Sequence, residues 1–177
     1  MPSIHKDNWI IYKGIGLCLI PKAGLNSFRA ITNASNSISA KEVTKLTTVR
    51  VAFMRDPIER FYSNYRFFHF LNKDRPDGFT QVPLEKTSNG FEVWVDYALE
   101  VANTHWCNQV DVMDGAYTIL HKFNNPSIHK HWPTYWPGKL PDWKNAMGGT
   151  LPMSDYKADK IIEYYAPDIE LFNTIGE

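Results

Sequence analysis

The chain has 177 residues, of which 44% are hydrophobic. This length suits one domain with a buried core, and the composition excludes wholesale disorder. Nineteen basic and nineteen acidic residues give zero formal net charge, so the basic excess of a dedicated nucleic-acid-binding protein is missing. The two cysteines, Cys18 and Cys107, are too few for a disulfide framework and fit a reducing compartment. The apolar run over residues 15–20 has the length of a strand and not of a membrane span. We therefore expect one soluble, cytoplasmic domain over residues 1–177, with neither membrane insertion nor a nucleic-acid partner.

The first half of the chain predicts two strand–helix units. Residues 14–20 are apolar and mostly branched, which indicates a short buried strand that ends at Pro21. The small and polar residues 22–27 then form a loop that opens a helix. A second strand is predicted over residues 49–54, and Arg55 follows it directly.

The helix after the second strand has the clearest start signal of the chain. Asp56 can cap it, Pro57 suits its first position, and Glu59 completes a capping box. Apolar residues then recur with a period of 3.6, which predicts one buried helix face: Ile58, Phe61, Tyr62, Tyr65 and Phe68.

The second half of the chain continues the alternation of helices and strands. In chain order it predicts a loop over residues 72–89, a helix over 89–102, a strand over 117–123, an irregular stretch over 126–150, and a last helical region that Ser154 caps and Pro167 divides. Strands separated by helices predict an α/β fold with a small parallel sheet flanked by helices.

The loop between the first predicted strand and its helix has the features of an anion site. The N-terminus of a helix presents unpaired backbone N–H groups and the positive end of a dipole. Lys22 adds a full charge, Gly24 permits close approach of the backbone, and Asn26 and Ser27 offer side-chain hydrogen bonds. The Walker A pattern is missing, because the lysine precedes the glycine. An ordinary strand–helix turn with a surface lysine would show the same pattern.

A second candidate anion site follows the second strand. Arg55 ends that strand, and Ser63 lies eight residues further on, in the helix that Asp56 caps. Arg60 and Ser63 are three residues apart, which predicts that both lie on the polar side of that helix. A guanidinium beside a hydroxyl can bind a phosphate, so two anion sites at adjacent strand ends suit a ligand with two separated phosphates. The alternative is a local ion pair of Arg55 with Asp56 or Glu59.

Both segments resemble motifs of one enzyme family. Residues 20–29 resemble the 5′-phosphosulfate loop of sulfotransferases, and residues 51–65 are similar to their 3′-phosphate motif. Together they resemble the carbohydrate and membrane-enzyme branch of the family, which uses 3′-phosphoadenosine 5′-phosphosulfate (PAPS). Residues 91–97, 105–109 and 164–172 resemble later segments of the same branch. The chain departs from the family at Asn124, where a glutamate is common, in the short segment between the two phosphate motifs, and in the missing membrane anchor.

The resemblance implies a P-loop-NTPase-like sulfotransferase fold and an in-line transfer of a sulfuryl group from PAPS to a hydroxyl acceptor, without a metal. By analogy with phosphoryl transfer, Lys22 would stabilise the leaving phosphate, while Arg55 and Ser63 would clamp the 3′-phosphate. The residues implied to bind PAPS are Pro21, Lys22, Ala23, Gly24, Leu25, Asn26, Ser27, Phe28, Arg55 and Ser63.

Two residues are candidates for the general base that takes the proton of the acceptor hydroxyl. His105 lies in the segment that resembles the family, and an imidazole has an ordinary pKa close to neutral pH. A structural histidine that holds the loop is the alternative. Glu42 lies between the phosphate motifs, but the neighbouring Lys41 and Lys45 would lower its pKa. We therefore expect His105 to be the base.

Aromatic and histidine residues cluster late in the chain. The aromatic cluster consists of Trp132, Tyr135, Trp136 and Trp143. On loops, such residues favour a carbohydrate acceptor, and the alternative is that they pack in the core or within a loop. The histidines at positions 121, 129 and 131 lack the neighbouring cysteines of a structural zinc site.

Two other functions fit the candidate anion loops after the first and second strands. One is a P-loop-like nucleotide kinase, and the other is a nucleotide-binding module without catalytic activity.

Overall fold

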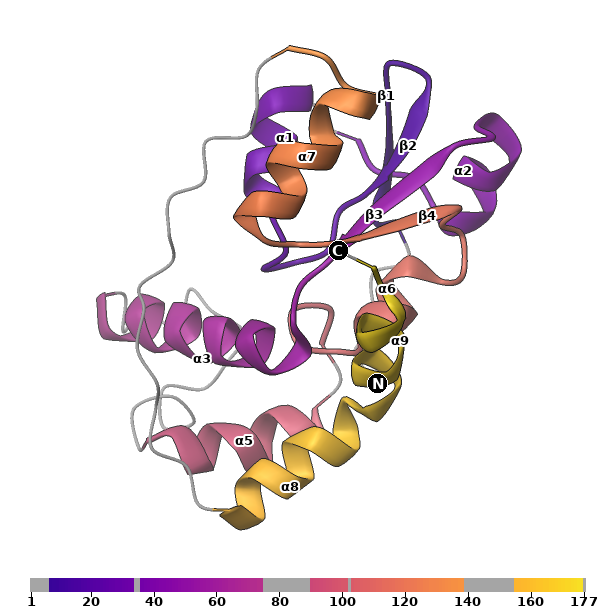
Figure 1. The fold of residues 1–177 in the computed structure, drawn as a ribbon. Coiled ribbons are helices and arrows are strands. Elements are labelled where there is room, and N and C mark those ends of the chain that lie inside the picture. The colour runs from indigo at the N-terminus through magenta and orange to yellow at the C-terminus, as the bar shows by residue number, and fades with distance from the viewer. Residues whose placement is uncertain (1–6, 34–35, 75–89, 102, 139–154, 177) are drawn as a thin grey trace.

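A four-stranded sheet forms the centre of the fold in the computed structural model, which describes residues 7–33, 36–74, 90–101, 103–138 and 155–176 (Figure 1). Its strands, in spatial order, are β1 (Trp9–Tyr12), β2 (Ile15–Cys18), β3 (Arg50–Met54) and β4 (Ile119–Lys122). β1 pairs with β2 in the antiparallel direction, whereas β2, β3 and β4 are parallel. The chain is therefore an α/β protein with a mostly parallel sheet flanked by helices.

The described helices lie on both faces of the sheet and beyond its carboxyl edge (Figure 1). In chain order they are α1 (Leu25–Thr32), α2 (Ala40–Leu46), α3 (Pro57–Asp74), α5 (Phe91–Glu100), α6 (Gln109–Met113), α7 (Asn125–Tyr135), α8 (Asp155–Tyr164) and α9 (Ala166–Thr174). The parallel strands thus end on the side from which the loop to α1 and the start of α3 emerge.

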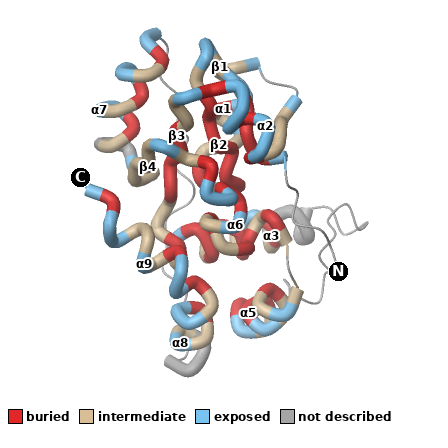
Figure 2. The backbone as a smooth tube through the Cα atoms, turned by 90° about the vertical axis from the view of Figure 1, so that its right-hand side faces the viewer, coloured by how far each residue is buried: buried red, intermediate tan, exposed pale blue. Residues whose placement is uncertain are grey.

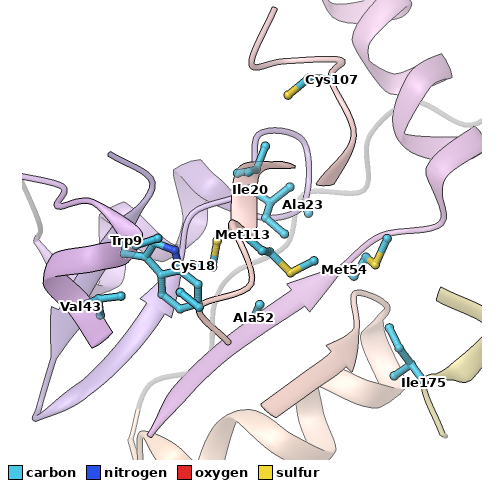
Figure 3. Close-up of a cluster of buried hydrophobic side chains, with 13 residues drawn as sticks. Trp9, Cys18, Ile20, Ala23, Val43, Ala52, Met54, Cys107, Met113 and Ile175 are labelled. Carbon is cyan, nitrogen blue, oxygen red and sulfur yellow. The ribbon is translucent and has the colours of Figure 1, made fainter. Parts of the chain in front are cut away.

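Side chains alternate between two cores on the faces of the sheet, as the twofold period of a strand requires. In β3, Val51 and Phe53 pack under α1 and α7, whereas Ala52 and Met54 point to the face covered by α2 and α6 (Figure 3). Both faces of the central strands are buried: after the first residue of each strand, β2 and β3 are red in Figure 2. This explains why these strands have apolar runs and not an alternating pattern.

A close approach between β2 and α2 requires the glycine at position 16. A Cβ atom there would lie 2.7 Å from Cγ2 of Val43 and 3.0 Å from Cγ of Arg50. Real Cβ atoms do not come so close to a branched side chain, so only glycine lets α2 lie directly on the strand.

A third core lies below the carboxyl edge of the sheet, among α3, α5, α8 and the start of α9 (Figure 1). The stripe predicted for the helix that Asp56 caps faces this core. Phe61, Tyr65 and Phe68 surround the fully buried Trp94 of α5, with ring centroids 5.7–6.3 Å from its indole. α3 is thereby held with its opposite side toward the end of the sheet.

Several elements differ from the sequence-based expectations. The irregular stretch predicted from residue 126 is wrong at its start, because α7 forms there; residues 139–150 lie outside the described part of the chain. The Pro126 residue occupies the first turn of α7, where a missing N–H is harmless, and the Asn124 side chain caps that turn by accepting a hydrogen bond from Ser127 N. The stripe of Ile128, Trp132 and Trp136 is buried.

The antiparallel strand β1 and the helices α2 and α6 were not predicted. β1 joins β2 through Lys13 and Gly14, both with positive φ (50° and 79°), which is the backbone of a two-residue hairpin turn. The β-forming residues 9–12 before this Lys-Gly pair were the available signal.

The predicted division of the last helical region is confirmed, since α8 ends and α9 begins around Tyr165.

Candidate functional site

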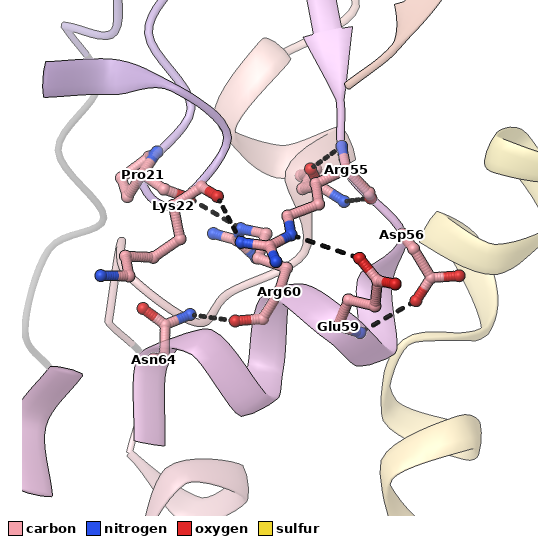
Figure 4. Close-up of polar contacts among 8 residues, drawn as sticks. Pro21, Lys22, Arg55, Asp56, Glu59, Arg60 and Asn64 are labelled. Carbon is pink, nitrogen blue, oxygen red and sulfur yellow. Dashed lines mark hydrogen bonds and ion pairs between the residues drawn. The ribbon is translucent and has the colours of Figure 1, made fainter. Parts of the chain in front are cut away.

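The parallel strands β2 and β3 bring the two predicted cationic residues together. Lys22 follows β2 and Arg55 follows β3, and parallel neighbours end at the same edge of a sheet. Nη1 of Arg55 donates a hydrogen bond to the carbonyl oxygen of Lys22 at 3.2 Å (Figure 4). The two candidate anion sites are therefore directly linked through the backbone.

The loop before α1 turns through two left-handed residues. Lys22 has φ of 64° and Gly24, the N-cap residue of α1, has φ of 88°. A positive φ is rare for a residue with a side chain, so this loop holds Lys22 in an unusual conformation. The Phe28 N–H bonds to the carbonyl of Gly24, whereas the N–H groups of residues 25–27 precede the first helical hydrogen bond and are the ones that can bind an anion.

One cavity of about 1080 Å³ lies against this loop. Most of the residues that the sequence predicts to bind PAPS or to act as base line this cavity: Pro21, Lys22, Gly24, Leu25, Asn26, Ser27, Arg55, Ser63 and His105. Ala23 and Phe28 do not line it. Both are fully buried in the hydrophobic core, where Phe28 stacks on Trp132 at 5.3 Å.

The electrostatics of the cavity centre on Lys22. Burial, together with the charges of Arg55 and Arg66, lowers the pKa of its amine to about 8. Its Nζ lies 3.9 Å from the ring centroid of Phe67, which also lines the cavity. Like charges gathered in a partly desolvated place favour the binding of an anion.

Arg66 and Phe67 were missed by the sequence analysis. They follow Ser63 by three and four residues, so the three lie on one face of α3. The charge of Arg66 also acts on Arg55, whose pKa is lowered first by burial. Helical spacing from Ser63 was the signal that could have identified both residues.

The local ion pair considered as an alternative for Arg55 is present. Arg55 Nε lies 3.6 Å from a carboxylate oxygen of Glu59, which is two-thirds exposed (Figure 4). Only half of the predicted capping box forms, because the Glu59 N–H donates to Asp56 at 2.9 Å while its carboxylate turns to Arg55. This pair leaves the Arg55 side chain on the cavity wall and fixes its orientation from one side.

Gln109 fixes the backbone of Arg55 from the other side. Its side-chain amide accepts from Arg55 N at 3.0 Å and donates to Arg55 O at 2.8 Å. The carboxylate of Asp168 in turn accepts from the backbone N–H groups of Gln109 and Val110, at 2.7 and 3.0 Å. The predicted motifs at 105–109 and 164–172 therefore act together to hold the start of α3.

Arg60 was expected on the polar face of its helix, but the structure buries it. Its guanidinium is fully buried and donates to the carbonyl of Pro21 at 2.9 Å (Figure 4). It also donates to the carbonyls of Cys107 and Thr104, at 2.7 and 3.3 Å. One side chain of α3 thus ties the loop before α1 to the segment that carries His105.

His105 lines the cavity, as does Lys22. The fully buried Asn64 donates to the His105 carbonyl at 2.6 Å, and the edge of the imidazole meets the Phe68 ring. The structure therefore brings the favoured base candidate to the same cavity as both cationic residues.

Glu42 lies elsewhere. It sits in the first turn of α2, where its carboxylate accepts from the N–H and the hydroxyl of Ser39, at 2.9 and 2.7 Å, in a complete capping box. These hydrogen bonds, first that from the Ser39 hydroxyl, lower the pKa of Glu42. Its role is to start α2, and it does not line the cavity.

Comparison of the chain with protein-family models, with curated proteins and with solved structures returned no match. The chemistry of the cavity itself must therefore indicate the function.

The late aromatic and histidine residues pack together. Trp132 and Trp136 are buried against the sheet. The hydroxyl oxygen of Tyr135 lies 3.0 Å from Nε2 of His121. Trp143 lies outside the described residues. Burial and the neighbouring His131 and Lys130 lower the pKa of His121 to about 4.

Among the described residues, no group of three or more histidine, cysteine or acidic residues could hold a metal ion, and no helix is long and apolar enough to cross a membrane.

Proposed function

We propose that this chain transfers a sulfuryl group from PAPS to a hydroxyl-bearing acceptor, on a sulfotransferase variant of the P-loop fold. The observation that carries the proposal is the link between Lys22 and Arg55 at the ends of β2 and β3, in one cavity with Ser63 and His105. These are the residues on which the resemblance to sulfotransferases depends.

The arrangement of charges supports a ligand with two separated phosphates. The N-terminus of α1 and Lys22 would hold the 5′-phosphosulfate, because residues 25–27 at the start of α1 and Lys22 line the same cavity. Arg55 and the hydroxyl of Ser63 would hold the 3′-phosphate. A 3′-phosphate distinguishes PAPS from ATP, so this second site would provide the selectivity.

The residues would then divide the transfer between them. An oxygen of the acceptor forms a bond to sulfur while the bond between sulfur and the 5′-phosphate oxygen breaks. His105 would take the acceptor proton, and Lys22 would stabilise the charge that grows on the leaving adenosine 3′,5′-bisphosphate. Glu42 has no part in this proposal, since its carboxylate caps α2.

The buried tryptophans do not extend the proposal to a particular acceptor. Trp132 stacks on Phe28 with an interplanar angle of 5° and is fully buried, so its ring face is occupied by the core. We therefore propose a hydroxyl acceptor and do not assign its chemical class from these tryptophans.

Binding of nucleotides tests the proposal first. Adenosine 3′,5′-bisphosphate at 100 times its Kd should raise the free energy of unfolding by about 2.7 kcal/mol, whereas adenosine 5′-monophosphate and ATP at the same concentration should raise it much less. Arg55→Ala should remove this preference. Lys41→Ala, which removes one exposed charge from α2, should leave it unchanged. Equal stabilisation by the three nucleotides would overturn the assignment of the 3′-phosphate site.

Transfer of labelled sulfate from PAPS to a panel of hydroxyl acceptors tests the chemistry. Product formation that depends on Lys22 would support the transferase. A chain that binds the bisphosphate tightly and transfers nothing across the panel would be a nucleotide-binding module, and tight binding of ATP would indicate a kinase instead.

A further inference from the structure

Asn103 contacts His105 through a single oxygen atom. Oδ1 of Asn103 lies 2.9 Å from the backbone nitrogen of His105 and 2.9 Å from Nδ1 of its imidazole. The same atom therefore meets the main chain and the side chain of the candidate base.

These two contacts together determine where the imidazole proton lies. A backbone N–H can only donate, so the Asn103 atom that it meets must be the amide oxygen and not the amide nitrogen. This excludes the flipped orientation of the amide. Because the oxygen can only accept, Nδ1 must also donate to it. The neutral imidazole then carries its proton on Nδ1 and its lone pair on Nε2.

Neighbouring side chains hold His105 in this position. The buried Asn64 donates to its carbonyl oxygen at 2.6 Å. The Phe68 ring meets the imidazole edge to face, with centroids 5.3 Å apart and an interplanar angle of 81°. The backbone and the ring of His105 are thus both held where the residue lines the cavity.

We propose that Asn103 is a positioning residue that keeps His105 in the tautomer protonated on Nδ1. The tautomer follows from the contacts alone. Its use in catalysis rests on the proposed function: Nε2 takes the proton of the acceptor hydroxyl as the bond from the acceptor oxygen to sulfur forms. The Nδ1–H bond to Asn103 then steadies the resulting imidazolium, as an orienting partner does for other catalytic histidines.

The tautomer can be measured without any activity. In protein labelled with ¹⁵N-histidine, two-bond proton–nitrogen correlations distinguish a protonated from an unprotonated ring nitrogen, and His105→Gln identifies the His105 signals. We expect a protonated Nδ1 in the wild type and in Asn103→Asp, and a loss of that preference in Asn103→Ala. Asn173→Ala, on an exposed position of α9, is the control. A wild type protonated on Nε2, or an Asn103→Ala variant with an unchanged tautomer, would overturn the inference.

Kinetics then test the catalytic part. Asn103→Ala should lower kcat for sulfuryl transfer about 10- to 100-fold, with the Kd for adenosine 3′,5′-bisphosphate kept within about twofold. Asn103→Asp should recover most of the rate and move the acidic limb of the pH–rate profile upward by about one pH unit, because a carboxylate favours the imidazolium. An unchanged profile in Asn103→Asp would exclude a positioning role. If the wild type shows the expected tautomer and transfers no sulfate, the proposed function fails while the tautomer stands.

Discussion

At the scale of single residues, burial and the neighbouring positive charges both disfavour the protonated form of Lys22. Its amine is partly desolvated beside Arg55 and Arg66, and its pKa falls to about 8 as a result. The left-handed backbone at φ of 64° and the Phe67 ring 3.9 Å from Nζ hold this charge on the cavity wall. A bound anion would offset the repulsion, so Lys22 should be fully protonated in a complex and only partly protonated in the free protein above pH 8.

Binding of adenosine 3′,5′-bisphosphate should therefore weaken as the pH rises. Below about pH 8 the free protein already carries the proton on Lys22, whereas above it binding must take up a proton. The Kd should increase by up to about tenfold per pH unit between pH 8 and 9.5. Calorimetric titrations at a series of pH values measure this slope.

A matched pair of variants assigns that slope. Lys22→Arg keeps its charge over the whole range, so the slope should disappear. Lys41→Arg changes an exposed lysine on α2 and should leave it intact. A slope that persists in Lys22→Arg would mean that another group titrates with binding.

At the scale of elements, α3 organises the site from both of its sides. One side carries the apolar stripe into the core around Trp94, and the other carries Ser63 and Phe67 to the cavity. Arg60 of the same helix connects two further parts of the site, since it donates to a carbonyl of the loop before α1 and to one of the segment with His105. The position of α3 therefore determines the distance between the parts of the site.

Arg60→Met should destabilise the protein strongly. Methionine fills a similar volume but leaves the buried carbonyls of Pro21, Cys107 and Thr104 without their donor. We expect the free energy of unfolding to fall by about 3 kcal/mol, measured by urea denaturation. Arg29→Met, on an exposed position of α1, should change it by less than about 0.5 kcal/mol. Equal effects of the two variants would contradict the role given to Arg60.

At the scale of the whole molecule, the C-terminal helical region contacts the segment over residues 105–109, which carries His105 and Gln109. The hydroxyl of the buried Tyr165 donates to the Trp106 carbonyl, and Asp168 accepts from the start of α6. These contacts join parts of the chain 59 residues apart. The C-terminal helices thereby support the backbone on which His105 and Gln109 lie.

Tyr165→Phe tests this support. It removes one hydroxyl and leaves the Trp106 carbonyl without that donor, so the free energy of unfolding should fall by about 1–2 kcal/mol. For a chain of this size the Tm should drop by about 2–8 °C. Tyr164→Phe removes the hydroxyl of the half-buried neighbouring tyrosine and should have a smaller effect on the thermal melt. A larger loss in Tyr164→Phe would refute the assignment.

The elements that the sequence predicted well are those whose signals are local. The strands near residues 14–20, 49–54 and 117–123 and the helix that Asp56 caps all form, with ends shifted by a few residues. α7 was missed because Pro126 and Pro133 indicated a loop, although the first proline lies in the tolerant first turn. α2 was missed because its short apolar pattern is weak, yet its Ser39–Glu42 capping box is complete.

By itself the sequence determined the α/β class, the loop with Lys22 and the placement of Arg55 at a strand end, because each follows from residues close together in the chain. Only the tertiary structure decided which candidates meet. It joined Lys22 to Arg55, brought His105 to their cavity and left Glu42 on α2. It also buried Arg60, which a helical pattern had placed on a polar face. The reason is physical: a buried charge needs partners, and the carbonyls that Arg60 binds come from segments 39–47 residues away, a separation that no local pattern encodes.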